Sequence, residues 1–186
     1  MKKQIEVTEE LLASWKKEFG GFYELPVGDK VAYLKIPTMT DFKRGLRALT
    51  EDGEIAYSEE MLRALWLGGD NEIKELDEYF TPARKALKKL LEFEDAVIKK
   101  LDNRQSEITI KGFKCKLRYI TRQDLQRAER ENPSGKVFVT QEKLFEIVCI
   151  EKDAAFDNRN NASIRFPLYQ ALEELQNSKF TTLKKH

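Results

Sequence analysis

Several residue types that carry chemistry are scarce in this chain of 186 residues. The single histidine is the last residue, His186, so histidine-based triads, general bases and metal sites are effectively excluded. The two cysteines, Cys115 and Cys149, lie in alternating or apolar stretches with no histidine nearby. That setting favours small core side chains over zinc binding or thiol chemistry. We therefore expect no catalytic residues, no metal site and no cofactor.

Long apolar runs and an excess of one charge are missing as well. No run approaches the roughly 20 residues that cross a bilayer, and the first ten residues lack the apolar stretch of a signal peptide. These absences predict a cytoplasmic protein that does not enter a membrane. The 33 basic and 32 acidic side chains leave a net charge of +1, so we do not expect nucleic acid to be the partner. A local basic patch stays compatible with that total.

Motifs for phosphate or calcium are also absent. No GxxxxGK[ST] loop occurs, and the acidic segments 68–78 and 151–163 lack the regular ligand spacing and central glycine of a calcium loop. Solvated loops are the favoured interpretation of both segments. A carboxylate-only enzyme is the one catalytic class that the sequence leaves open, and we rank it last because no set of polar residues converges.

What the sequence does contain is a repeated helix start. The segment 38–47 reads TMTDFKRGLR, and the segment 121–130 reads TRQDLQRAER. In each, a threonine stands three residues before an aspartate, which is an acidic version of the capping box. The sequence therefore predicts that a helix begins at each pair, with these structural caps: Thr38, Asp41, Thr121 and Asp124.

The similarity extends through both halves of the chain in the same order. Residues whose numbers differ by 83, such as Glu24 and Glu107, match through the segment before the caps, and Gly28-Asp29 predicts a β-hairpin there. A long helix is expected to begin at Thr81-Pro82 and to end near Asn103. We interpret the chain as an internal duplication.

The predicted fold class is α+β, with two tandem homologous units that each contain a β-hairpin followed by two or three helices. An extra N-terminal helix is expected in residues 1–21, the first unit in 22–104 and the second, diverged unit in 105–186. Such small units cannot cover their sheets alone, so we expect them to pack about a pseudo-twofold, within one compact domain or two. The oligomeric state is not predicted.

Four arginines recur within the repeated segments: Arg44, Arg47, Arg127 and Arg130. The two members of each pair are three residues apart and so share a helix face. They are either solvated, paired with acidic side chains or part of a shared binding surface, and the first two interpretations are favoured.

Three stretches of the first half resemble small proteins from the structural-gene region of tailed bacteriophages, related to tail-assembly chaperones. They read VAYLKIPTMTDF, LWLGGDNEI and YFTPARKALKKLLEFEDAVIKKL, within residues 22–101. The known relatives are often a single unit, whereas this chain carries a second copy with VCIEKDAAF in place of LWLGGDNEI. Any role of the Gly-Gly turn therefore belongs to the first half.

The resemblance implies a non-enzymatic function: binding an aggregation-prone tail or virion component until the particle assembles, in the host cytoplasm. A groove between helices would take an amphipathic segment, with Trp66, Leu62 and Phe80 as candidate lining residues. Two alternatives are a permanent virion or connector protein, and a nucleic-acid-binding module that uses the four arginines.

Overall fold

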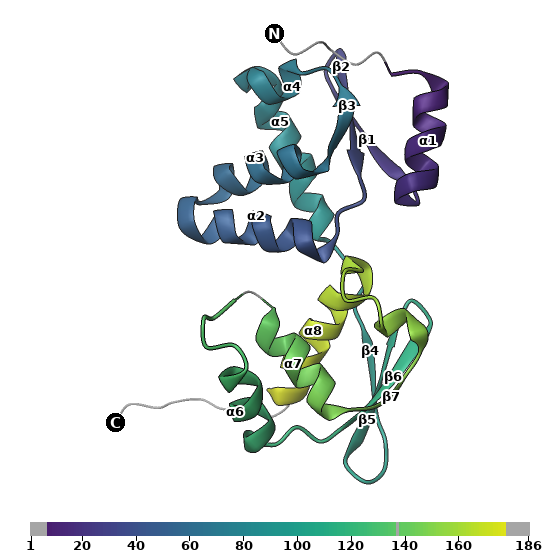
Figure 1. Cartoon of the computed structure of the whole chain (residues 1–186), viewed down its shortest axis with the longest axis vertical. Coiled ribbons are helices and arrows are strands. Elements are labelled where there is room, and N and C mark those ends of the chain that lie inside the picture. The colour runs from purple at the N-terminus through teal and green to yellow at the C-terminus, as the bar shows by residue number, and fades with distance from the viewer. Residues whose placement is uncertain (1–6, 137, 178–186) are drawn as a thin grey trace. The chain divides into compact units, whose positions relative to one another are not determined.

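The computed structural model describes residues 7–136 and 138–177 of the chain (Figure 1). The chain divides into two compact units, Met1–Glu92 and Phe93–His186, whereas the sequence placed the boundary after residue 104. The architecture is mixed α and β, as predicted, with eight α-helices and two antiparallel sheets among the described residues. His186 lies outside those residues. The predicted pseudo-twofold packing stays a prediction.

Unit 1, Met1–Glu92, contains one three-stranded sheet with strand order β1-β2-β3. Strands β1 and β2 form the predicted hairpin, in which Val27 pairs with Lys30 across the turn Gly28-Asp29. The elements of unit 1 are α1 (Glu9–Phe19), β1 (Phe22–Val27), β2 (Lys30–Lys35), α2 (Met39–Asp52), α3 (Glu54–Leu65), β3 (Trp66–Gly69), α4 (Glu72–Glu75), α5 (Asp77–Lys88) and the 3-10 turn η1 (Lys89–Leu91).

Unit 2, Phe93–His186, contains a four-stranded sheet with strand order β4-β5-β6-β7. Its elements are β4 (Val97–Lys100), β5 (Gln105–Ile110), β6 (Phe113–Arg118), α6 (Arg122–Arg130), α7 (Val139–Val148), β7 (Cys149–Lys152), the 3-10 turn η2 (Ala154–Phe156) and α8 (Ala162–Gln176). From β5 onward, this order repeats the order of unit 1 from β1 onward, with η2 in the place of α4.

The two sheets also share a local irregularity. In unit 1 the pairing of β2 with β3 shifts register after Tyr33, and in unit 2 the pairing of β6 with β7 shifts after Lys116. An aspartate follows the third strand in both units. The Asp70 carboxylate accepts a hydrogen bond from the Val31 backbone N–H at 2.8 Å, and the Asp153 carboxylate accepts one from Lys114 at 2.7 Å. Corresponding backbone groups therefore make corresponding bonds.

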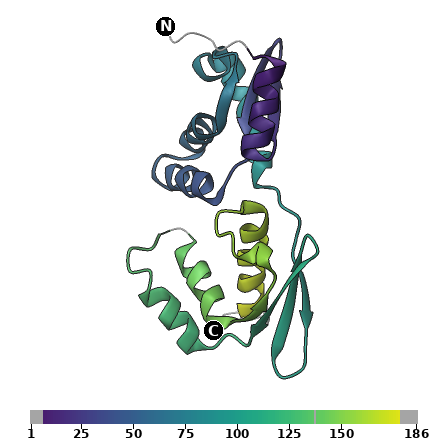
Figure 2. The ribbon, with the colours of Figure 1, turned by 45° about the vertical axis from the view of Figure 1, so that its right-hand side comes forward.

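Helix α1 covers one face of the unit 1 sheet, and Figure 2 shows it in front of the strands. The Trp15 ring centroid lies 6.3 Å from that of Phe22 and 5.9 Å from that of Tyr33. A Cβ atom on Gly68 of β3 would lie 2.9 Å from the Trp15 ring, so the glycine leaves room for the indole. The opposite face of the sheet carries the core side chains Leu25, Val27, Ala32 and Leu34.

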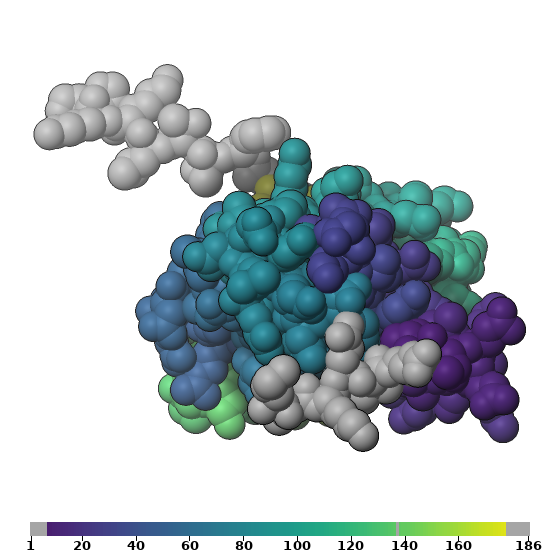
Figure 3. Space-filling model, turned by 90° about the horizontal axis from the view of Figure 1, so that it is seen from above, coloured from purple at the N-terminus to yellow at the C-terminus, as the bar shows by residue number. Residues whose placement is uncertain are grey.

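The tip of the β1–β2 hairpin is tied to α4 and α5. The Tyr79 hydroxyl donates to the Asp29 carboxylate at 3.0 Å, and the Lys30 ammonium lies 3.3 Å from the Glu72 carboxylate. In Figure 3 the hairpin, in dark blue, adjoins the teal side chains of these helices. These contacts fix the end of the sheet that bears the turn.

The predicted long helix from Thr81 to Asn103 is wrong. Helix α5 begins earlier, at Asp77, contains Pro82 and ends at Lys88, and residues 97–100 form β4. Val97 and Leu101 continue the apolar stripe at helical spacing, but β4 pairs with β5 and places Ile98 opposite Ile108. Pairing with a distant strand decides the conformation of this short β-branched segment.

The Gly68-Gly69 pair, described above as a turn, is part of a strand. Helix α3 ends at Leu65, and Trp66–Gly69 is β3. A Cβ atom on Gly69 would approach the backbone oxygen of Val31 to 2.2 Å. The glycine is therefore required where β3 lies against β2.

Candidate functional site

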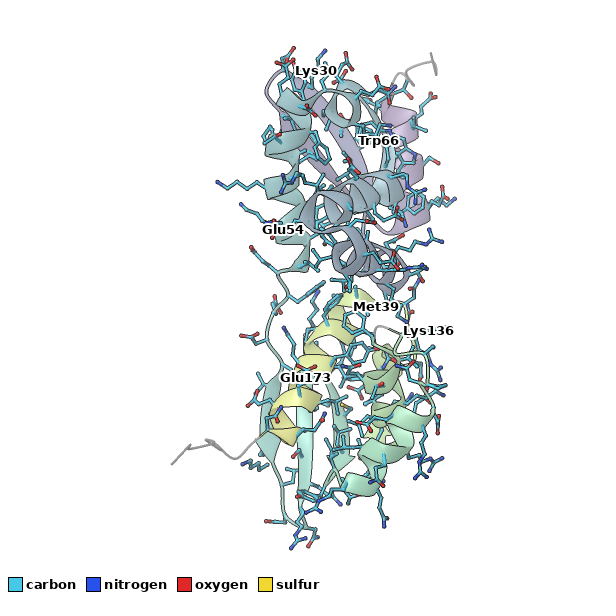
Figure 4. All side chains as sticks on the ribbon, turned by 90° about the vertical axis from the view of Figure 1, so that its left-hand side faces the viewer. Lys30, Met39, Glu54, Trp66, Lys136 and Glu173 are labelled. Atoms are coloured by element: carbon cyan, nitrogen blue, oxygen red, sulfur yellow. The ribbon has the colours of Figure 1, made fainter. Side chains whose placement is uncertain are left out.

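The three apolar candidates in unit 1 differ in their exposure. Leu62 of α3 is 1% exposed and belongs to the core, so its side chain does not line a surface. Trp66 of β3 (labelled in Figure 4) and Phe80 of α5 are half-buried. The Lys74 ammonium lies 3.7 Å from the Trp66 ring centroid, a cation–π contact that covers one face of the indole.

The four repeated arginines are exposed on α2 and α6. The Arg47 guanidinium lies 2.8 Å from the Glu51 carboxylate, and the Arg127 guanidinium lies 3.4 Å from the Glu131 carboxylate. One arginine of each pair thus has an acidic partner one helical turn away. Arg44 and Arg130 make no ion pair with any described residue. Of the four repeated arginines, these two have guanidinium groups open to an external anion.

Both capping boxes are formed, with the threonine hydroxyl accepting from the aspartate N–H and the aspartate carboxylate accepting from the threonine N–H. Each carboxylate also has a basic partner on the strand before it. Asp41 receives a bond from the Lys35 ammonium at 2.7 Å. Asp124 receives two bonds from the Arg118 guanidinium, both at 2.7 Å. The Arg118 bonds, with those from Thr121, hold the pKa of Asp124 well below its usual value.

A buried polar cluster in unit 2 was not anticipated from the sequence. Arg165 of α8 is 1% exposed and donates to the Phe156 carbonyl at 2.7 Å. Its Nη1 lies 3.3 Å from the Glu142 carboxylate, which also accepts from the Tyr169 hydroxyl. Burial and this bond raise the pKa of Tyr169. Neither Nε nor Nη1 of Arg165 finds an acceptor with hydrogen-bond geometry among the described residues.

The cluster lies in unit 2, and the corresponding described positions of unit 1 do not form one. Glu142 corresponds to Glu60, which pairs with Arg63 on its own exposed helix face. Phe80 occupies the place of Arg165 at a difference of 85 in residue number. Matching the residue types of the two halves therefore does not predict the cluster, because Phe80 is apolar where Arg165 is charged. The cluster holds α7, α8 and η2 together.

The open edge of β1 is the second feature that the sequence did not predict. Opposed residues in an antiparallel ladder alternate between hydrogen-bonded and non-hydrogen-bonded pairs, and a two-residue turn is closed by a bonded pair. Since Val27 and Lys30 close the turn, Val27, Leu25 and Tyr23 bond to β2. The backbone groups of Phe22, Glu24 and Pro26 point away from β2. Glu24 and Pro26 are exposed, and no described strand pairs with this edge.

In unit 2 the corresponding edge is occupied. Strand β5 matches β1 residue for residue, and β4 pairs along it with Val97 opposite Thr109 and Lys99 opposite Glu107. Thr109 and Glu107 are the counterparts of Pro26 and Glu24, at a difference of 83 in residue number. Among the described residues, unit 1 therefore has an unpaired strand edge at the place that unit 2 fills with β4. The sequence carried a signal in the β-branched pair Val97-Ile98, which the helical stripe obscured.

Cys115 is buried, and burial raises the pKa of its thiol to about 12, so little thiolate forms at neutral pH. Within residues 7–136 and 138–177, no group of three or more His, Cys, Asp and Glu side chains is placed to hold a metal ion. None of the described helices is long and apolar enough to cross a bilayer.

Comparisons with known proteins add no relative. No protein-family model, no curated protein and no solved structure matches the chain. The function of the chain is therefore inferred from the residues and contacts described above.

Proposed function

We propose that the chain is a non-enzymatic protein-binding protein that acts as a chaperone-like factor in the assembly of bacteriophage particles. It holds a segment of a tail or other virion component in the host cytoplasm until that component is incorporated. The observation that carries this proposal is the open edge of β1 in unit 1, whose counterpart in unit 2 is filled by β4. An exposed strand edge is a template for another polypeptide segment.

The resemblance of residues 22–101 to tail-assembly chaperones supplies the biological setting of this proposal. Trp66 and Phe80 are half-buried in unit 1 and stay separate candidate contact residues, since Trp66 lies on β3, on the other side of β2 from the open edge. Leu62 contributes through the core that supports them.

We also infer that the two units arose by duplication within the chain. Support comes from the shared element order, the register shift at the same place in both sheets, and the matching capping boxes. The units have since diverged in what lies against their sheets. Unit 1 has α1 across one face, and unit 2 has β4 along one edge. Binding by unit 1 alone is consistent with that divergence.

The function is tested by mixing the purified chain with neighbouring gene products from its own genome, each expressed separately. We expect one neighbour that is insoluble alone to form a complex of defined mass, measured by light scattering after size-exclusion chromatography. A stable ring formed by the chain without any partner would contradict the chaperone proposal and indicate a permanent virion or connector protein.

The nucleic-acid alternative is tested with the four exposed arginines. We expect no salt-sensitive retention of the chain on duplex DNA, and no difference when Arg44, Arg47, Arg127 and Arg130 are all replaced by glutamate. Retention that falls steeply with salt and is lost in this variant would instead indicate binding to phosphates.

A further inference from the structure

We propose that the β1 edge of unit 1 accepts one short extended segment of the partner protein, antiparallel to β1, with an apolar residue opposite Leu25 and a basic residue opposite Glu24. This inference rests on the proposed function and specifies the sequence that the site recognises. It is argued from the way in which β4 occupies the corresponding edge of unit 2.

The backbone groups available on β1 define the length of the segment. Phe22 and Glu24 each offer an N–H and a C=O that point away from β2, whereas Pro26 offers only a C=O because proline has no N–H. The counterpart residues Gln105, Glu107 and Thr109 face β4 and the residue after it, and the Leu101 N–H donates to the Gln105 carbonyl at 2.9 Å. An added strand on β1 makes the same bonds except the one at Pro26. Proline at this position is compatible with an edge strand and ends the pairing there.

The side chains of β4 indicate what the segment carries. Ile98 lies opposite Ile108, a fully buried residue whose counterpart is Leu25, so the position opposite Leu25 favours an apolar side chain. Lys99 lies opposite Glu107, whose carboxylate pairs with the Lys114 ammonium at 3.1 Å; the counterpart of Glu107 is Glu24, and Val31 stands in the place of Lys114. The Glu24 side chain is exposed and makes no hydrogen bond or ion pair with a described residue. Opposite charges across a strand pair stabilise the pairing, which favours lysine or arginine at that position.

Two exposed apolar side chains extend the site beyond the strand backbone. Tyr23 is 45% exposed and Ile36 is 42% exposed. Tyr23 pairs with Leu34, and Ile36 lies two residues beyond Leu34 on the same side of the chain, so the two are diagonal neighbours. The residue of the segment that lies opposite Tyr23 therefore meets apolar surface, which accommodates a long side chain such as the lysine at the Lys100 position of β4.

A second copy of the chain fits this edge less well than a partner protein. Antiparallel pairing of two β1 strands about Glu24 brings the two Glu24 carboxylates opposite each other, and like charges at that place destabilise the pair. Each Pro26 also lacks an N–H toward the other strand. The β4 segment of a second copy is already paired with its own β5.

The test uses a synthetic peptide with the sequence of residues 95–102, DAVIKKLD, with acetylated and amidated ends, and the full-length chain. We expect saturating peptide to slow amide hydrogen exchange at Glu24 by at least about tenfold, followed residue by residue by NMR, because a free edge N–H becomes hydrogen-bonded. Amides of β5 and β6 should be unchanged, since β4 already covers that edge.

Two N-methylated peptides form a matched pair that isolates the backbone bonds. The N–H of the residue matching Lys99 points toward the receiving strand, and the N–H of the residue matching Ile98 points away from it. N-methylation at the Lys99 position should abolish the slowed exchange at Glu24. N-methylation at the Ile98 position should preserve it.

Charge reversal tests the side-chain preference separately. The variant Glu24→Lys should bind the peptide about fivefold more weakly, which is the size expected for one cross-strand charge pair. A peptide with glutamate at the Lys99 position should bind this variant better than it binds the unaltered chain.

Three results would overturn the proposal: no change at Glu24 with millimolar peptide, changes confined to β5, or equal losses with both N-methylated peptides. A chain that forms a dimer through β1 without peptide would show that the occupant is a second copy. Failure of the peptide while a defined complex still forms with a neighbouring gene product would reject the segment chemistry proposed for this edge and leave the binding of a virion component standing.

Discussion

The carboxylates of Asp41 and Asp124 correspond to each other in the two capping boxes, but the hydrogen bonds that they accept differ in strength. Asp124 accepts two parallel bonds from the planar guanidinium of Arg118, whereas Asp41 accepts one bond from the ammonium of Lys35. Paired bonds from arginine to a carboxylate are among the strongest hydrogen bonds in proteins. Unit 2 therefore depends more on its cap than unit 1 does.

We predict that Asp124→Asn lowers the free energy of unfolding of unit 2 by about 2 kcal/mol at pH 7, the size of hydrogen bonds to a charged group. Because the pKa of Asp124 is lowered in the folded state, its contribution is complete above the unfolded pKa of about 3.9 and is lost as pH falls below it. The difference between variant and parent should therefore shrink below pH 4. Urea denaturation at pH 7 and pH 3 measures it, with Asp41→Asn as the control of smaller effect. A difference that does not depend on pH would contradict the argument.

Glu142 neutralises an arginine that is almost inaccessible to water. We predict that Glu142→Gln destabilises unit 2 by about 3 kcal/mol, because Arg165 stays buried and loses its counter-charge. The matched control is Glu60→Gln at the corresponding position, where the partner Arg63 is exposed and the loss should be below about 1 kcal/mol. Equal and small losses in both variants, measured by urea denaturation, would show that Arg165 does not need Glu142.

At the scale of elements, the edge of β1 that faces away from β2 differs from the corresponding edge of β5 by one backbone N–H. Pro26 lacks this group, and Thr109 has it. We predict that Pro26→Thr supplies this group in unit 1 and strengthens binding of the peptide of residues 95–102 about threefold, a fraction of one hydrogen bond. The reciprocal variant Thr109→Pro removes the N–H from unit 2 and should speed amide exchange in β4. The NMR exchange experiment described above measures both effects. Unchanged exchange of β4 in Thr109→Pro would contradict the assigned pairing.

Elements set by neighbouring residues were predictable from the sequence. The turn Gly28-Asp29 and the capping pair Thr38 and Asp41 act within a few residues, and the structure contains both the hairpin and the helix start. Strands β3, β4 and β7 are four residues each and depend on partners elsewhere in the chain. Their conformation is decided by pairing, which local periodicity does not reveal.

The candidate contact residues show the same limit. A sequence identifies Trp66 and Phe80 as large apolar side chains, and both are half-buried. It does not distinguish them from Leu62, which is buried in the core. The unpaired edge of β1 could not be predicted from the sequence for a different reason. An edge is unpaired when no strand lies beside it, and the sequence does not show which strands are neighbours.

At the scale of the whole molecule, each unit has a core of its own. Phe42, Met61 and Leu65 are at most 1% exposed in unit 1, as are Ile108 and Leu172 in unit 2. We predict that the fragments 1–92 and 93–186 each fold when expressed separately, because a compact unit with its own core is a potential folding unit. Amide NMR spectra of the two fragments should together reproduce most signals of the full chain. A fragment with the narrow signal dispersion of an unfolded chain would contradict this.

Both tryptophans of the chain, Trp15 and Trp66, belong to unit 1. Trp15 of α1 is 7% exposed, and Trp66 lies against Lys74. Selectively excited indole fluorescence therefore reports the melting of unit 1 alone, whereas far-ultraviolet circular dichroism records helix and strand in both units. The two tryptophans are thus an intrinsic fluorescence probe of unit 1. Two different midpoints from these signals in one denaturation would mean that the halves lose their structure separately.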